Sequence, residues 1–242
     1  MSGRNLFGRT HPAVIAVWAA VLAAATVLPS IPLIGTGGTF SVATALFPLS
    51  GIFFGPLAGF VTAAIGSFIG GLLAPHTAWM GMATFLVGAI SALAGGLVAE
   101  GKWGTTVLAL GIIAVGTLLW YSHPIGQNAP LLPVVYYGTG VVAMLLGTVL
   151  VKKGYLVDSN TKRAVAVWAI GLGSMVATAS IANWAALMLF STPAEVWWVL
   201  TFQAPVQRVI FAVGTALIGV PLLVGLPKIG VFVGPLVDDE EE

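Results

Sequence analysis

The chain carries no Asp, Glu, Lys or Arg from Thr10 to Ala99, a run of 90 residues. Only 7% of the whole sequence is charged and 58% is hydrophobic, whereas about 25% of the residues in soluble domains are charged. A soluble protein needs charged side chains over its surface, and no globular core takes up a run of this length. The sequence therefore predicts a polytopic membrane protein, and it disfavours soluble enzymes, disordered regulators and nucleic-acid binders.

The apolar stretches have the length and pattern of transmembrane helices. A helix needs about 20 apolar residues to cross the hydrocarbon core. Barrel strands would alternate apolar and polar residues, and the segments 107–119 and 141–151 do not. Pro, Gly and charged residues divide the chain into eight candidate spans, at 12–29, 39–54, 56–74, 77–99, 103–121, 130–151, 163–190 and 204–226. We expect an all-α transmembrane bundle of about eight spans, with 1–242 as a single domain and 227–242 as a cytoplasmic acidic tail.

Two prolines lie at positions that shape this pattern. Pro48 lies inside the second segment and predicts a bend. Phe54-Gly55-Pro56 follows that segment, and it is consistent with either a tight turn between two helices or a kink in one.

The basic residues predict the orientation of the bundle. With eight spans, all but one fall on the same side: Arg4, Arg9, Lys102, Lys152, Lys153, Lys162, Arg163 and Lys228. Arg208 alone falls on the other side. Because Lys and Arg favour the cytoplasm, both termini should be cytoplasmic. The opposite face then carries loops near 30–38, 75–78, 122–129 and 191–203, so a small-molecule site should open outward.

The sequence offers little for catalysis or energy coupling. It contains no HExxH, no paired carboxylates, no GxSxG and no Gly-rich phosphate loop with Lys. Cysteine is absent, the three His residues are scattered, and the net charge is only +1. No Asp, Glu or His lies within the first six segments, which disfavours a transporter driven by its own ion relay. We expect no enzyme activity, no metal or other cofactor, and no nucleic-acid partner.

Arg208 is the one charged residue inside a predicted span. It either snorkels to the outer interface or contacts a ligand, because ionisable residues within the membrane are functional candidates. Gln203 and Gln207 are one helical turn apart beside it, and the three together suit a carboxylate or an amide. A simple ion pair with Glu195 would instead favour a structural role.

Further candidates lie on the same predicted outer side. Asn183 and Trp184 are near the outer end of the seventh span, where Asn forms either a helix-to-helix hydrogen bond or part of a cavity wall. Trp79 and Trp197 suit either an interfacial aromatic belt or stacking on a planar ligand. His76 completes the candidate substrate-binding set.

Small residues recur every four positions on several helices. The repeats are Ala16/Ala20/Ala24, Ala19/Ala23, Gly51/Gly55/Gly59, Gly66/Gly70 and Ala92/Gly96. Close packing inside the protein explains most of them. The stripe Ala16/Ala20/Ala24 suits either that packing or a docking face for another membrane subunit.

The stretch from Phe40 to Gly70 resembles helices two and three of the substrate-binding S components of energy-coupling-factor (ECF) vitamin transporters. The shared pattern is a Pro-kinked short helix, a Gly-Pro turn and then a small-residue helix. Segments 84–97 and 204–223 are also similar, and Ala16/Ala20/Ala24 resembles the alanine motif by which S components dock on the coupling subunit. The resemblance is good over 12–99, partial over 163–226 and absent between.

The resemblance implies a subunit in the prokaryotic plasma membrane that captures a vitamin-like nutrient and then topples in the bilayer. Its coupling subunit and ATPases would be separate chains. The family has six helices, so 103–151 is a candidate inserted hairpin. The ligand motifs of the riboflavin, thiamine and biotin members are not found. A non-transport accessory subunit of a larger complex and a passive channel formed by oligomers are the alternative functions.

Overall fold

The computed structural model describes residues 11–28, 30–32, 39–231 and 233–234. The helices are α1 (Pro12–Ala25), α2 (Ala43–Phe54), α3 (Pro56–Leu73), α4 (Phe85–Ala99), α5 (Trp103–Tyr121), α6 (Pro124–Asn128), α7 (Gly138–Lys152), α8 (Asn160–Leu189) and α9 (Ala194–Gly225). Short helical turns are η1 (Pro75–Thr77), η2 (Gly81–Thr84), the π-helical η3 (Pro133–Tyr137) and η4 (Leu226–Ile229). The strands β1 (Ser30–Pro32) and β2 (Thr39–Ser41) pair antiparallel, with Ile31 opposite Phe40.

The helical membrane fold agrees with the sequence prediction, and eight apolar helices correspond to the eight predicted segments. Within the described residues, six helical segments are long and apolar enough to cross a membrane, namely 56–73, 81–99, 103–121, 133–152, 160–189 and 194–229. The helices α1 and α2, with 14 and 12 residues, are shorter. The number of helices that span the bilayer is therefore six by length, and eight only if α1 and α2 also insert.

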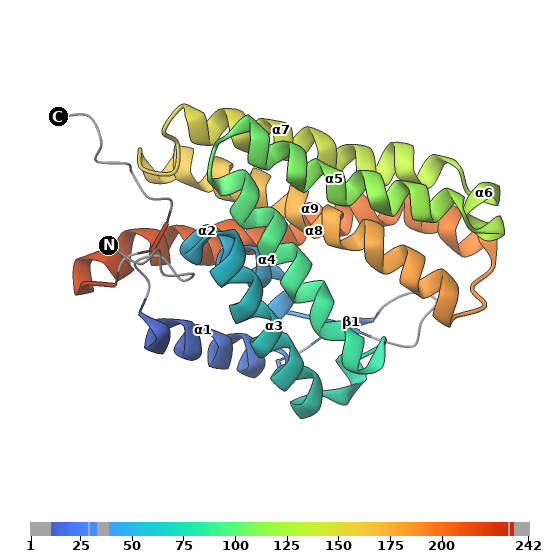
Figure 1. Cartoon of the computed structure of the whole chain (residues 1–242), viewed down its shortest axis with the longest axis horizontal. Coiled ribbons are helices and arrows are strands. Elements are labelled where there is room, and N and C mark those ends of the chain that lie inside the picture. The colour runs from blue at the N-terminus through green and yellow to red at the C-terminus, as the bar shows by residue number, and fades with distance from the viewer. Residues whose placement is uncertain (1–10, 29, 33–38, 232, 235–242) are drawn as a thin grey trace, which may run out of the picture.

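The bundle is built around α8, which packs against α4, α5, α7 and α9. The helices α5, α7, α8 and α9 run roughly along the long axis of the molecule, and α1 to α4 form a second group beside them (Figure 1). Within that second group, α3 packs on both α1 and α4, and α2 packs on α4. The segment 103–151, which the sequence suggests as an insertion, therefore lies against the central helix.

Glycine permits the closest helix contacts. A Cβ on Gly51 would collide with the backbone oxygen of Ala92, and one on Gly96 would lie 2.6 Å from the Cα of Pro56. A Cβ on Gly66 would lie 2.7 Å from Cβ of Leu22 on α1. These stripes therefore pack inside the protein, as small residues do between membrane helices.

The segment Phe54-Gly55-Pro56 forms a tight turn between two helices. Gly55 has φ +80°, which residues with a side chain rarely adopt, and Pro56 occupies the first position of α3, where its missing N–H costs nothing. Pro48 lies within the helix α2, as predicted.

The start of the last helix corrects the sequence prediction. Residues 194–203 were expected in a loop of 191–203, and the structure places them in the first three turns of α9. Pro205 suggested a boundary, yet it lies inside the helix. Membrane helices tolerate such prolines because neighbouring groups satisfy the freed backbone. Arg208 is consequently well inside α9 rather than near its start.

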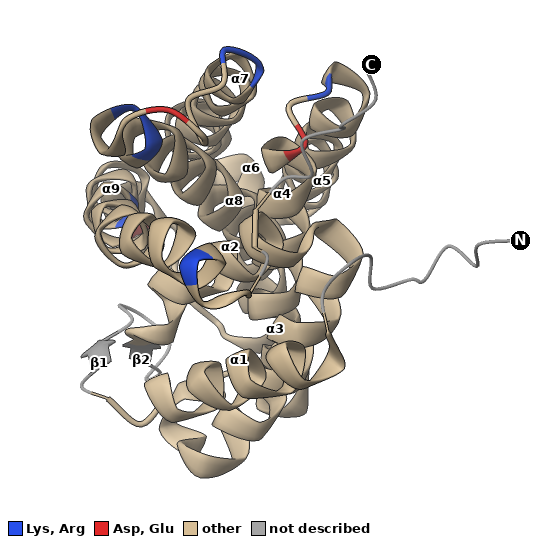
Figure 2. Ribbon diagram, turned by 90° about the vertical axis from the view of Figure 1, so that its left-hand side faces the viewer, with Lys and Arg blue, Asp and Glu red and all other residues tan. Residues whose placement is uncertain are grey.

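The described Lys and Arg residues other than Arg208 lie near helix ends that gather at one end of the bundle. Lys152 at the end of α7 lies 5.5 Å from the ring centre of Trp103 at the start of α5. Arg163 at the start of α8 donates a hydrogen bond from Nε to the carbonyl oxygen of Leu156. Figure 2 looks onto this end, where basic segments cap several helices. Arg4, Arg9 and the acidic residues 238–242 of the tail lie outside the described residues.

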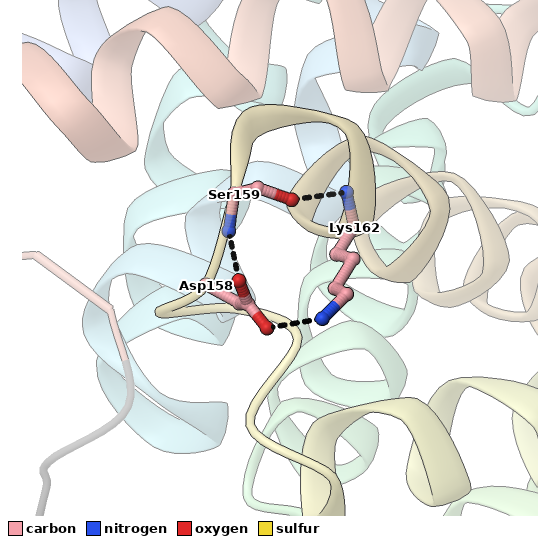
Figure 3. A network of polar contacts seen from close by, with 3 residues as sticks. All are labelled: Asp158, Ser159 and Lys162. Carbon is pink, nitrogen blue, oxygen red and sulfur yellow. Dashed lines mark hydrogen bonds and ion pairs between the residues drawn. The ribbon is translucent and has the colours of Figure 1, made fainter.

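The first turn of α8 has a polar cap at this end. Asp158 Oδ2 lies 2.6 Å from Lys162 Nζ, and its Oδ1 accepts a hydrogen bond of 2.6 Å from the backbone N–H of Ser159 (Figure 3). Ser159 Oγ in turn accepts from the backbone N–H of Lys162 at 3.5 Å. The hydrogen bond from Lys162, followed by that from Ser159, holds the pKa of Asp158 below its usual value.

Candidate functional site: a cavity lined by polar and aromatic residues

A cavity of about 90 Å³ lies among α2, α4, η3, α8 and α9. Its wall combines apolar and aromatic residues with a few polar ones. The described residues that line it are Thr44, Phe47, Trp79, Val87, Ser91, Tyr136, Met175, Thr178, Ala179, Ala182, Asn183, Ala186, Thr192, Trp197, Leu200, Gln203, Ala204, Gln207 and Arg208. A mostly apolar wall with a few convergent polar groups is typical of small-molecule sites.

Arg208 is buried in the wall of this cavity, with 7% of its surface exposed. Its Nε donates a hydrogen bond of 2.8 Å to the phenolic oxygen of Tyr136. A snorkelling Arg would extend its head group to the interface, so the burial contradicts that interpretation. Glu195 is exposed in the first turn of α9, about 20 Å away along the helix at 1.5 Å per residue. The proposed ion pair with Arg208 is therefore wrong.

Asn183 both joins two helices and lines the cavity. Its Nδ2 donates a hydrogen bond of 3.2 Å to the phenolic oxygen of Tyr137, which satisfies the structural interpretation, and the residue is also part of the wall. Tyr136 and Tyr137 are adjacent in the π-helical turn η3. Such turns often occur at functional sites, and this one supplies the partners of both Arg208 and Asn183.

Two buried polar atoms belong to residues of the same wall and have no hydrogen-bond partner among the described residues. They are the indole Nε1 of Trp197 and the hydroxyl of Ser91. Trp197 is 3% exposed and packs edge-on against Trp120, with 5.0 Å between ring centres. Its burial contradicts a place in a lipid-facing aromatic belt. Buried polar groups are nearly always paired, so these two atoms distinguish the cavity from ordinary core.

The remaining predicted residues divide between the cavity and the surface. Gln203 and Gln207 lie on one face of α9 and line the cavity, with Gln203 exposed. Trp79 also lines it and packs against Phe190. Two predicted residues are not part of the described wall: Trp184 lies elsewhere on α8, and His76 is exposed on η1.

Sequence reasoning missed Tyr136, Ser91 and the other cavity residues from distant helices. A pair of adjacent tyrosines three residues after Pro133, inside an otherwise apolar segment, was the available signal for Tyr136. Nothing local distinguishes Ser91 from the other small residues of α4. Among the described residues, no group of three or more His, Asp or Glu is arranged to hold a metal ion.

The cavity lies far from the basic end of the bundle. On α8, twenty positions separate Arg163 from Asn183, and twenty positions separate Arg208 on α9 from Lys228 in η4, the helical turn that follows α9. At 1.5 Å per residue each separation is about 30 Å, roughly the thickness of the hydrocarbon core. Asn183 and Arg208 therefore lie toward the end of the bundle opposite the basic residues.

The first helix presents the predicted alanine stripe to the outside. Ala16, Ala20 and Ala24 are exposed, whereas Ala19 and Ala23 are buried. The buried alanines belong to the side of α1 that packs against α3. The two stripes thus face in different directions, and the exposed one takes no part in the internal packing.

Comparison with known proteins gives one match. Residues 10–123 match the model of the family described as ECF-type riboflavin transporter, S component. No curated protein and no solved structure matches the chain. The match confirms the predicted resemblance to ECF S components, a family of membrane-embedded substrate-binding subunits of transporters and not of enzymes. It extends through 103–121, the first half of the suggested insertion, and does not include 163–226.

Proposed function

We propose that this chain, which is of the ECF S-component type over residues 10–123, is the substrate-binding subunit of an uptake transporter in a prokaryotic plasma membrane. It captures a small vitamin-like nutrient at the outer face. The single observation that carries this proposal is the cavity that brings Arg208, Asn183 and Trp197 together. These residues come from two long helices, and the structure surrounds them with apolar and aromatic side chains.

The positions of the charged residues support outward capture. Lys and Arg favour the cytoplasmic face, so the basic end of the bundle is cytoplasmic in this proposal. The cavity then lies near the outer face, within reach of external nutrients. Both termini belong on the cytoplasmic side in the same orientation.

The exposed stripe Ala16/Ala20/Ala24 supports a docking role. Small side chains let a partner helix approach closely, and the coupling subunit is the partner in this proposal. The separate ATPases supply the energy, because the sequence contains no phosphate loop. Ligand binding and docking are thereby assigned to different helices.

A binding screen on the purified protein tests the capture role. We expect one member of a panel of vitamins, riboflavin included, to raise the melting temperature of the protein, and mass spectrometry to detect a bound small molecule. No shift across the panel, together with no bound molecule, would contradict nutrient capture.

Co-purification separates transport from the alternatives. Association with a coupling subunit and ATPases is the expected result. A stable complex that lacks ATPases would favour an accessory subunit instead, and solute flux into liposomes containing this chain alone would favour a channel.

A further inference from the structure

The chemistry of the cavity wall limits what the cavity can bind. Among its described lining residues Arg208 is the only charged one, and neither Asp nor Glu is present. The guanidinium is planar and matches the geometry of a carboxylate. A cationic ligand would meet the positive charge of Arg208 at close range, and like charges in a region of low dielectric repel strongly.

The unpaired donors of the wall indicate the same kind of ligand. The N–H of Trp197 can only donate a hydrogen bond, and it has no acceptor among the described residues. Ser91 is 2% exposed and its hydroxyl is likewise unpaired there. Ser67 has the third such atom, but it does not line the cavity. Acceptor atoms of a bound molecule would satisfy these two cavity residues.

Tyr136 extends this set of donors. Its phenolic oxygen accepts the hydrogen bond from Arg208 Nε, so its own hydrogen is available to donate to another acceptor. Tyr136 also lines the cavity. Phe47, Trp79 and Met175 complete the wall with apolar surface, which suits a flat, apolar body better than a sugar-like one.

We propose that the cavity binds a small soluble anion, a carboxylate on a flat apolar body, with the carboxylate oxygens hydrogen-bonded by Arg208 and Tyr136. This inference rests on the proposed capture function and names the class of ligand. It excludes ligands whose only charged group is an amine.

Three matched aromatic probes test the class of ligand. Benzoate, benzamide and benzylammonium share a ring and differ in the charge of one group. Binding to the purified full chain is measured by calorimetry in neutral detergent, with sodium chloride at equal ionic strength as the control. We expect benzoate to bind at least tenfold more tightly than benzamide, and benzylammonium not to bind. Benzamide or benzylammonium equal to benzoate, or no benzoate binding, would overturn the inference.

Two variants test the residues. Tyr136→Phe removes the phenolic O–H beside Arg208 and retains the aromatic ring, and we expect it to weaken benzoate binding about tenfold. Arg208→Lys is used in place of Arg208→Gln, because it retains the buried charge. We expect Arg208→Lys to keep the preference for benzoate over benzamide at lower affinity. Full benzoate affinity in Tyr136→Phe, or loss of the preference in Arg208→Lys, would contradict the assignment.

The head group of an anionic lipid offers acceptor oxygens like those of a carboxylate. A comparison of two lipid environments distinguishes a bound lipid from a soluble ligand. Benzoate binding is compared in nanodiscs of phosphatidylcholine and of phosphatidylglycerol. Equal affinity supports a soluble ligand, whereas loss of binding in phosphatidylglycerol would assign the cavity to lipid and overturn the inference. Failure of the proposed role as a transporter subunit would instead appear as absence of the coupling subunit and ATPases with benzoate binding intact.

Discussion

Arg208 on α9 donates a 2.8 Å hydrogen bond from Nε to the phenolic oxygen of Tyr136 on η3, and the two residues are 72 positions apart in the chain. Both are buried, at 7% and 2% exposure. The bond joins the last long helix to the turn that precedes α7. It also holds a cationic group at a fixed point of the cavity wall.

Tyr136→Phe tests this relationship. The variant leaves a buried, charged donor without its acceptor, and we expect a loss of about 1–3 kcal/mol of stability. Thermal unfolding in detergent measures it. The matched variant Tyr137→Phe breaks the neutral bond from Asn183, so its effect should be about 1 kcal/mol. Unchanged stability in Tyr136→Phe would show that the bond does not hold η3 to α9.

Gly96→Ala tests the close approach of α4 to the turn between α2 and α3. The new Cβ would lie 2.6 Å from backbone atoms of Pro56, which cannot move aside as a flexible side chain can. We expect destabilisation of about 1–3 kcal/mol or more, as for other overpacked sites. Melting temperature and expression yield report the effect.

Gly111→Ala on α5 is the control for that change. A Cβ there meets no described atom within 4 Å, and Ala is favoured over Gly inside a helix by about 0.5–1 kcal/mol. We therefore expect equal or higher stability. Unchanged stability in Gly96→Ala would mean that helix packing at Gly96 is looser than the structure indicates, and similar losses in both variants would assign the loss to a cause other than this contact.

Ala20→Leu tests the proposed docking face. Ala20 is exposed on α1, so the larger side chain should leave folding and benzoate affinity unchanged. It should reduce co-purification of the coupling subunit at least tenfold, because a bulky residue keeps a partner helix away. Ala114→Leu, at an exposed position of α5, is the matched control and should retain the complex. Equal recovery of the complex from both variants would remove the docking role.

Single introduced cysteines test the orientation of the protein in the membrane. The sequence contains no cysteine of its own, so only the introduced residue can be labelled. Gln127→Cys lies in α6, opposite the basic end, and Lys153→Cys lies at the basic end. The native residues at both positions are exposed. In intact cells a membrane-impermeant maleimide should label position 127 and not position 153. The reverse pattern would place the cavity on the cytoplasmic side.

The cap of α8 predicts a local dependence on pH. The pKa of Asp158 is lowered by its hydrogen bonds, so its stabilising contribution is present above the usual carboxyl pKa and is lost as the pH falls through the lowered value. We expect faster hydrogen exchange in the first turn of α8 under acidic conditions. Asp158→Asn should remove that pH dependence, whereas an identical profile in the variant would assign it to another group.

The sequence determined the fold class because the bilayer imposes simple rules. The charge-free run required a membrane, and a membrane requires helices whose backbones are satisfied internally. Helix positions followed from Gly, Pro and charge, except at α9, where Pro205 does not end the helix. The partition of Lys and Arg likewise placed Arg208 apart from the other basic residues.

Only the tertiary structure decided which polar residues meet. Asn183, Trp197 and Arg208 were visible as unusual residues, but their convergence depends on how α8 packs against α9 and η3. Ser91 comes from a helix with no local signal of a site, and Tyr136 comes from a segment whose one signal is its pair of adjacent tyrosines. The exposure of Ala20 and the burial of Ala19 likewise follow from the side of α1 that faces α3. Helical periodicity allows several faces to be buried, and only packing between distant segments selects one.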